Sequence, residues 1–197
     1  MTTERERAKA QRRQELLKQA AAIMAEKGFH QTRLADVGAA VGISGPALYR
    51  HFANKEDLLG AILIEISIRL VDGARAAFAR HTDDVADNPG AVLEELLAMH
   101  VDVAVDEADL VRVQGREIDN LEEGVRAKVR SLQRAYLGQW TDALLRARPD
   151  LDRPTARVRV QAAATLLNAA RYVLHWADRD WLKEELTKMA RAAMLVE

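Results

Sequence analysis

The chain of 197 residues is long enough to bury a core and to form one large or two small domains. It contains no cysteine, which excludes disulfide frameworks, thiolate metal sites and cysteine nucleophiles. The formal net charge of −1 is unevenly distributed, because residues 1–55 carry a net +5 and residues 56–197 carry −6. A basic segment followed by an acidic one indicates that the first segment binds a polyanion. The alternative is a solvated helix face with a chance bias.

The composition favours helices. Hydrophobic residues make up 49% of the chain, aromatic residues only 5%, and alanine occupies 35 positions, which is typical of a helical protein rather than a β-sandwich. The first fifteen residues lack an apolar run, and no stretch of about 18 apolar residues occurs. We therefore expect neither export nor membrane insertion, and we expect a cytoplasmic location.

Capping residues mark the helices of the first 80 residues. Gly28 follows an apolar stripe at helical spacing and is expected to end the first helix. Thr32, Ser44 and Asn54 each precede a further stripe, as N-cap residues do. The predicted helices cover about residues 5–27, 33–41, 45–52 and 55–80.

A loop is predicted at residues 81–90, where turn formers surround Pro89 and Gly90. Apolar residues at helical spacing then predict five more helices, at about 92–103, 110–118, 125–144, 154–176 and 182–193. No alternating segment of useful length predicts a strand. The expected fold is all-α, with about nine helices.

The two short helices between residues 32 and 52 predict a helix-turn-helix, joined at Gly42. The second helix of such a motif enters the major groove, which is about 12 Å wide, so the turn before it must be tight. This arrangement predicts sequence-specific contact with double-stranded DNA.

The stretch TRLADVGAAVGISGPALYRHFANKEDLL (residues 32–59) resembles the DNA-binding head of the TetR family of bacterial transcriptional regulators. The matching positions are Thr32, Val37, Ala40, Gly42, Ile43, Ser44, Leu48, Tyr49, His51, Phe52, Lys55, Glu56 and Leu58. Gly38, Val41 and the segment SGPAL depart from the usual pattern, which leaves the base preference open.

The resemblance implies a helix-turn-helix DNA-binding domain at 1–55 and a helical ligand-binding and dimerisation domain at 56–197. Carried over position by position, DNA contacts are expected at Thr32, Arg33, Ser44, Gly45, Pro46, Ala47, Tyr49, Arg50, His51 and Lys55. Thr32 and Lys55 would bind phosphates, and Arg50 would reach guanine or a phosphate. Ile43, Leu48 and Phe52 are expected in the core. The expected partner is a near-palindromic operator.

A small-molecule effector is also implied by the resemblance. Polar or aromatic side chains among apolar neighbours are the candidates to bind it: His100, Gln114, Tyr136, Trp140, Asn168, Tyr172 and His175. For each of them, packing in the core or in an interface is the alternative. Together they predict a largely apolar cavity with few polar anchors. Residues 115–140 resemble regulators associated with acyl-CoA or other lipid-derived molecules.

The predicted helices at 154–176 and 182–193 are expected to pair with a second copy, since their small residues and apolar stripe suit a four-helix seam. A monomer with both helices packed inward is the alternative. The metal, phosphate-loop and nucleophile motifs of enzymes do not occur, so we expect no catalysis, no cofactor and no metal. The prediction is a ligand-responsive repressor. The alternative is a helical interaction module that has lost DNA binding, although the basic head, Tyr49 and Lys55 are all retained.

Overall fold

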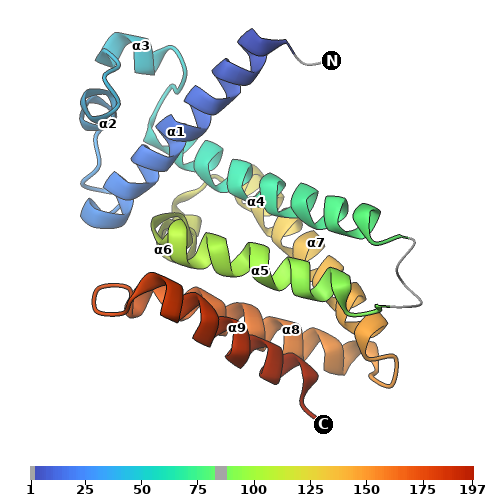
Figure 1. Ribbon diagram of the computed structural model, residues 1–197. Helices are drawn as coiled ribbons and strands as arrows, with labels where there is room; N and C mark the ends of the chain where they lie inside the picture. Colours follow the sequence, from blue (N-terminus) through green and yellow to red (C-terminus); the bar gives the residue numbers. More distant parts are fainter. Residues whose placement is uncertain (1–2, 83–87) are drawn as a thin grey trace.

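The computed structural model describes residues 3–82 and 88–197, and all regular structure within them is helical (Figure 1). The nine α-helices of these residues are α1 (Glu4–Lys27), α2 (Leu34–Ala40), α3 (Gly45–Tyr49), α4 (Lys55–Arg80), α5 (Ala91–Asp106), α6 (Ala108–Glu117), α7 (Glu123–Ala147), α8 (Arg153–Leu167) and α9 (Arg179–Leu195). Two short 3-10 helices, η1 (Ile118–Asn120) and η2 (Asn168–Tyr172), follow α6 and α8. The prediction of an all-α fold with about nine helices is confirmed.

Two of the predicted helix boundaries are set by caps. Gly28 ends α1 with φ of 80°, a left-handed conformation that favours glycine. The Asn54 side chain accepts a hydrogen bond of 2.7 Å from the backbone N–H of Asp57 and so begins α4. Gly42 also has positive φ, 66°, in the turn between α2 and α3. The tight turn of the helix-turn-helix therefore depends on a glycine.

The structure corrects the prediction that Thr32 caps the second helix. The N-cap of α2 is Arg33, without a capping side-chain bond, and the Thr32 hydroxyl instead donates to the carbonyl of Gly28 at 2.8 Å. Ser44 does occupy the N-cap position of α3, but its side chain makes no capping bond. The helix α3 ends three residues earlier than predicted, because the chain tightens at His51, whose N–H donates to the carbonyl three residues before it.

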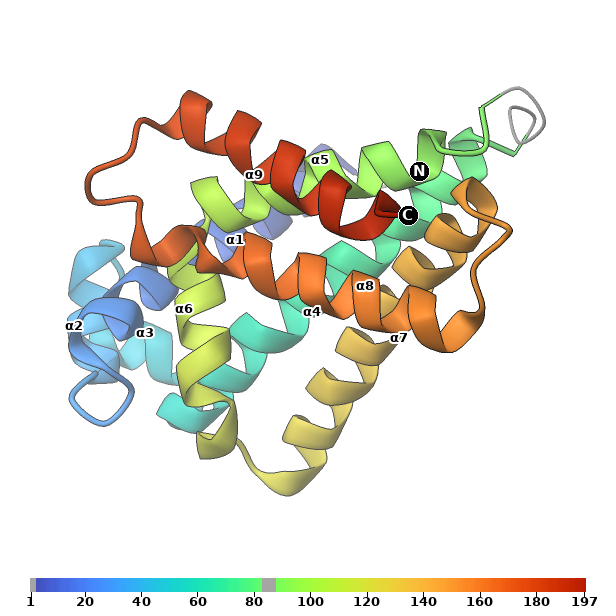
Figure 2. The same ribbon diagram turned by 90° about the horizontal axis from the view of Figure 1, so that it is seen from below.

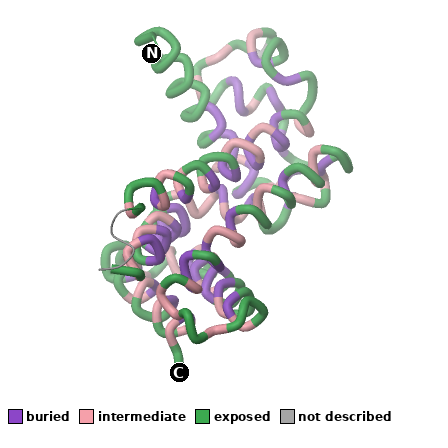
Figure 3. Tube along the Cα trace, turned by 90° about the vertical axis from the view of Figure 1, so that its right-hand side faces the viewer, coloured by how far each residue is buried: buried purple, intermediate pink, exposed green. Residues whose placement is uncertain are grey.

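Two hydrophobic cores meet along α4. The first packs α1, α2 and α3 against residues 58–66 of α4 and extends to α6 and the start of α7. The second packs the rest of α4 with α5, α7, α8 and α9 around the fully buried Trp140. Buried residues line the inner faces of these helices, whereas the first turns of α1 are exposed (Figure 3). Because α4 contributes to both cores, the division at residue 55 stays a prediction.

The C-terminal half contains one further correction. The helix predicted at 154–176 ends at Leu167, and the chain continues through η2 and a turn to Asp178, which caps α9. The alanines and apolar residues after Leu167 extend the helical stripe in the sequence, but periodicity does not distinguish a 3-10 turn from an α-helix. In Figure 2, α8 and α9 lie side by side across the face turned toward the viewer. The predicted loop at 81–90 falls largely on residues 83–87, which lie outside the described residues.

Candidate functional site

The short helix α3 presents polar side chains to solvent. Tyr49 is 56% exposed and is followed by exposed Arg50 and His51. Leu48 and Phe52 are buried in the first core, as predicted, whereas Ile43 packs against that core and is only partly buried. One face of the helix is therefore anchored, and the other is free to enter a groove. Of the other predicted DNA-contact residues, Arg33, Ser44 and Pro46 are exposed, Ala47 is half-buried, and Gly45 begins the helix.

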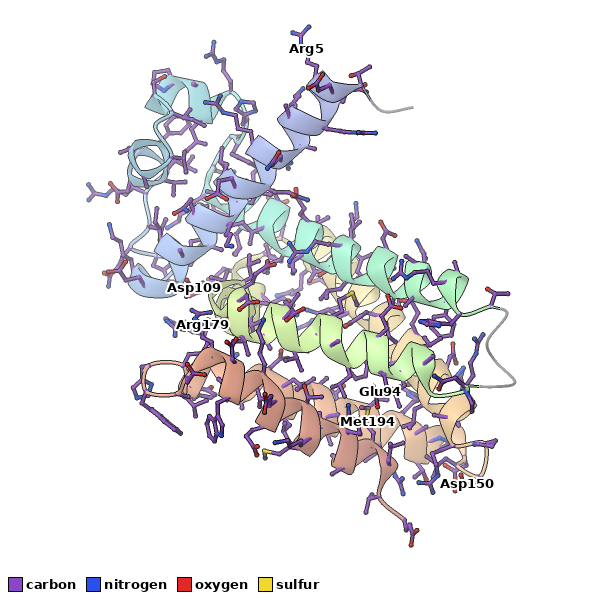
Figure 4. All side chains as sticks on the ribbon, viewed as in Figure 1. Arg5, Glu94, Asp109, Asp150, Arg179 and Met194 are labelled. Carbon is purple, nitrogen blue, oxygen red and sulfur yellow. The ribbon has the colours of Figure 1, made fainter. Side chains whose placement is uncertain are left out.

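The first turns of α1 bring positive charge to the same end of the molecule. The basic residues before Arg13 are exposed, and Figure 4 shows Arg5 pointing outward at the top of α1, the end at which α3 also lies. Arg13 differs, because its Nε lies 3.2 Å from a carboxylate oxygen of Glu65 and its guanidinium stacks on the Phe52 ring at 5.6 Å. Arg13 therefore ties α1 to α4 and to the end of the helix-turn-helix.

Thr32 and Lys55 lie differently from the other predicted DNA-contact residues. Thr32 is only 2% exposed, and its hydroxyl donates a hydrogen bond to the carbonyl of Gly28. The Lys55 ammonium lies 4.5 Å from the centre of the Phe29 ring and donates to the carbonyls of Phe29 and His30 at 3.4 and 3.2 Å. Both side chains hold the turn between α1 and α2 in this structure. Their phosphate contacts stay predictions.

A cavity of about 470 Å³ lies among α4, α5, α6, α7, α8 and the two 3-10 helices. Four predicted ligand-binding residues line it: His100, Gln114, Tyr136 and Asn168. The walls between them are largely apolar, with Ile66, Leu70, Val103, Val111, Ile118, Leu132 and Leu137. Its volume falls within the range of about 300–1,000 Å³ that is typical of small-molecule sites. The wall supplied by α4 was not part of the sequence prediction.

Three predicted ligand-binding residues do not line this cavity. Trp140 is completely buried behind it, with its ring edge-on to those of His100 and Tyr136. Tyr172 and His175 are exposed, because the α-helix ends at Leu167 and the following turn directs both residues outward. The predicted α-helix would have kept both residues on the face that points into the protein.

Sequence reasoning also missed polar residues that line the cavity. Arg130, Gln133 and Arg134 lie on one face of α7, and Arg171 extends from η2. Their spacing of three and four residues, continued by Leu137, places the α7 residues on a shared face. The spacing was visible in the sequence, but it did not show that this face meets a cavity rather than solvent.

His100, Tyr136 and Asn168 form a hydrogen-bonded chain in the cavity wall. The Nδ1 atom of His100 lies 3.1 Å from the Tyr136 hydroxyl, and its Nε2 lies 3.3 Å from Oδ1 of Asn168. Burial lowers the pKa of His100 to about 4, so its ring is neutral near pH 7, and burial raises the pKa of Tyr136. A neutral imidazole has one donor and one acceptor. Tyr136 therefore donates to His100, and His100 donates to Asn168.

The charge of the cavity lining is entirely positive. Arg130, Arg134 and Arg171 line it, and no Asp or Glu is among the described residues that do so. Arg130 is paired with Asp119 at 3.3 Å, and Arg171 donates to the backbone of α6 at 3.4 Å. The two arginines of α7 are exposed, whereas His100 is 7% exposed. The cavity thus runs from a basic, solvent-exposed rim to a neutral, buried end.

The end of α6 connects the cavity to the helix-turn-helix head. Glu117, which is 6% exposed, accepts hydrogen bonds from the backbone N–H of Phe29 at 3.4 Å and from the Asn120 amide at 2.9 Å. Gln114, one turn earlier on α6, lines the cavity. A displacement of α6 by a bound molecule would therefore act on the turn between α1 and α2.

Metal ligands do not cluster within residues 3–82 and 88–197, where no group of three His, Asp or Glu side chains could hold an ion. None of the described helices combines the length and the apolar character needed to cross a bilayer.

Comparison with known families agrees with this geometry. The model of "Bacterial regulatory proteins, tetR family" matches residues 16–62, and that of "Tetracyclin repressor-like, C-terminal domain" matches residues 86–193, more than half of the chain. The chain belongs to the TetR family. The resemblance seen in its sequence is therefore confirmed, and the matched family is one of bacterial regulatory proteins.

Two curated relatives of this chain, one named an activator and the other a repressor, match part of its length. The transcriptional activator FasR of Mycolicibacterium smegmatis is 34% identical over 74 residues, which are 38% of this chain and 34% of FasR. The transcriptional repressor KstR2 of Mycobacterium tuberculosis is 38% identical over 85 residues, 43% of this chain and 38% of KstR2. The matches thus span little more than a third of the length of these relatives.

Solved structures of TetR-family regulators share the whole fold. A regulator from Bordetella parapertussis superposes with a TM-score of 0.76 at 23% identity, covering 93% of this chain and 94% of the other. FadR of Bacillus subtilis, solved in complex with stearoyl-CoA, has a TM-score of 0.66 at 17% identity, with 91% and 98% covered. At these identities the similarity establishes the fold.

Proposed function

We propose that this TetR-family regulator is a homodimeric repressor that leaves its operator when an acyl thioester of coenzyme A occupies the cavity. The observation that carries the proposal is the cavity itself, whose walls are apolar and whose lining contains three arginines and no carboxylate. An apolar tail joined to an anionic headgroup matches both properties.

The names of the similar proteins support the proposal in part. FadR of Bacillus subtilis was solved with stearoyl-CoA, which is the class of ligand proposed here. KstR2 is named a repressor and FasR an activator, so these names favour neither direction of regulation. We favour repression because the link from the cavity through Glu117 to the head offers a route by which a ligand displaces the DNA-binding turn.

The proposed dimer seam is the outer face of α8 and α9. Val158 of α8 is 70% exposed, and Trp181 and Met189 of α9 are 50% and 52% exposed. Apolar side chains on two adjacent helices, without a covering element among the described residues, are typical of a self-complementary interface. A two-fold pair places two copies of α3 on DNA, so the expected operator is a near-palindrome with half-sites about 34–36 Å apart.

The test begins with selection of bound sequences from a randomised duplex library. An enriched near-palindrome is expected, and enrichment of no sequence over non-specific DNA would favour the alternative of a module that has lost DNA binding. The selected duplex is then titrated with stearoyl-CoA, with coenzyme A alone and with stearate, and binding is followed by fluorescence anisotropy. Stearoyl-CoA should lower operator affinity about 5–150-fold, which corresponds to a coupling of about 1–3 kcal/mol. Equal operator affinity with and without stearoyl-CoA would refute the proposed effector.

A further inference from the structure

The buried end of the cavity has a defined hydrogen-bonding polarity. The Tyr136 hydroxyl has a single hydrogen, which is directed to Nδ1 of His100, and the single N–H of the neutral imidazole is directed to Oδ1 of Asn168. The carbonyl oxygen of the Asn168 side chain is therefore oriented toward His100. Its amide nitrogen, at the opposite corner of the same planar group, carries two hydrogens.

The two amide hydrogens of Asn168 have no acceptor among the residues that the structure describes. Asn168 lines the cavity and is half-buried, so its amide group is within reach of a molecule bound there. The aromatic contacts hold the chain in place, because the rings of His100 and Tyr136 stack at 5.8 Å with 9° between their planes. Trp140 packs edge-on against both rings. The donor is thus pre-oriented, which limits the entropy lost when it forms a bond.

We infer that Asn168 determines which acyl compounds this regulator recognises, by donating a hydrogen bond from its side-chain amide to an uncharged carbonyl oxygen of the ligand. This inference rests on the proposed function and names the group that the buried end of the cavity recognises. The carbonyl of a thioester or of a ketone is an acceptor without charge. A carboxylate at this position would bring its charge next to His100, which is buried and neutral, and it would lose part of its hydration.

The arginines of the cavity complement this polarity from the other end. Arg130 and Arg134 belong to the exposed rim, where they meet anionic groups that remain partly hydrated. The cavity thus offers two separate polar contacts, the half-buried amide of Asn168 for an uncharged carbonyl and the arginines of the rim for an anionic headgroup. A free fatty acid has its only polar group at one end and satisfies one of the two sites, whereas an acyl thioester of coenzyme A satisfies both.

The experiment compares stearoyl-CoA with S-octadecyl-CoA, a thioether that keeps the chain and the headgroup but lacks the carbonyl. Dissociation constants are measured by isothermal titration calorimetry for the wild type, for Asn168→Leu and for the matched control Gln114→Leu. Gln114 is an amide that lines the same cavity and has no part in the His100 chain. The wild type should bind the thioester about three- to tenfold more tightly than the thioether, the effect of one net hydrogen bond. The preference should vanish in Asn168→Leu and persist in Gln114→Leu.

A second variant keeps the inference falsifiable if Asn168→Leu does not fold. Asn168→Asp preserves the shape and the acceptor for His100 but replaces the free donor by an oxygen, so it should weaken thioester binding more than thioether binding. Equal preference for the thioester in the wild type and in either folded Asn168 variant would overturn the inference, as would equal binding of both compounds by the wild type. In both cases the proposed effector class would stand. Binding of neither compound by the folded wild type would overturn the proposed function and the inference together.

Discussion

Protonation of His100 should destabilise the fold as the pH falls. Burial lowers the pKa of His100 in the folded chain to about 4, from a value of 6.5 when it is exposed in the unfolded chain. Between these two values the unfolded chain binds more protons than the folded chain, so the free energy of unfolding increases with pH in this interval. The stability that the fold gains from keeping His100 neutral is complete above pH 6.5 and is lost as the pH falls toward 4.

The size of the effect follows from the difference between the two pKa values. Each pKa unit corresponds to about 1.4 kcal/mol, so His100 should lower the free energy of unfolding by about 1 kcal/mol at pH 5.5 and by about 3 kcal/mol near pH 4, relative to pH 7.5. These losses are large beside the total stability of about 5–15 kcal/mol that is typical of a folded protein.

Urea unfolding of the wild type and of His100→Gln between pH 4 and 8 measures this contribution. The amide of Gln offers a donor and an acceptor but does not titrate, and subtracting the two curves cancels all other titrating groups. The stability advantage of the wild type should shrink by about 1 kcal/mol from pH 7.5 to pH 5.5. A difference between the two proteins that is independent of pH would refute the argument that His100 is buried and neutral in the folded state.

Four other variants test the head, the seam and the link between them. Tyr49→Ala should weaken operator binding by about 1–3 kcal/mol without changing thermal stability. Lys55→Ala should lower both operator affinity and thermal stability, because Lys55 also donates to two backbone carbonyls. Anisotropy measures the affinity and calorimetry the melting temperature, and an unchanged melting temperature of Lys55→Ala would contradict the structural role of Lys55. Val158→Glu should weaken self-association at least tenfold in analytical ultracentrifugation and leave the helical content intact, and an unchanged dimer would exclude this face as the seam. Glu117→Gln should bind stearoyl-CoA as the wild type does but change the release from operator about threefold or more, since the charged acceptor for the head is lost; equal release would remove Glu117 from the coupling route.

Local signals in the sequence predicted much of the head. Gly28 and Gly42 adopt positive φ and Asn54 caps α4, because these requirements involve only a residue and its immediate neighbours. The alternation of buried Leu48 with exposed Tyr49 follows from helical spacing alone. The TetR pattern joined these signals into one motif.

For the cavity, the sequence by itself determined the kinds of side chain, and the tertiary structure decided which of them meet. His100, Tyr136 and Asn168 come from three separate elements and form one hydrogen-bonded chain only when α5, α7 and η2 pack together. Tyr172 and His175 carry a similar chemical signal but are exposed, because the packing of η2 ends the helical stripe on which the prediction relied. Periodicity describes one helix at a time, whereas the cavity and its charge depend on contacts between residues far apart in the chain.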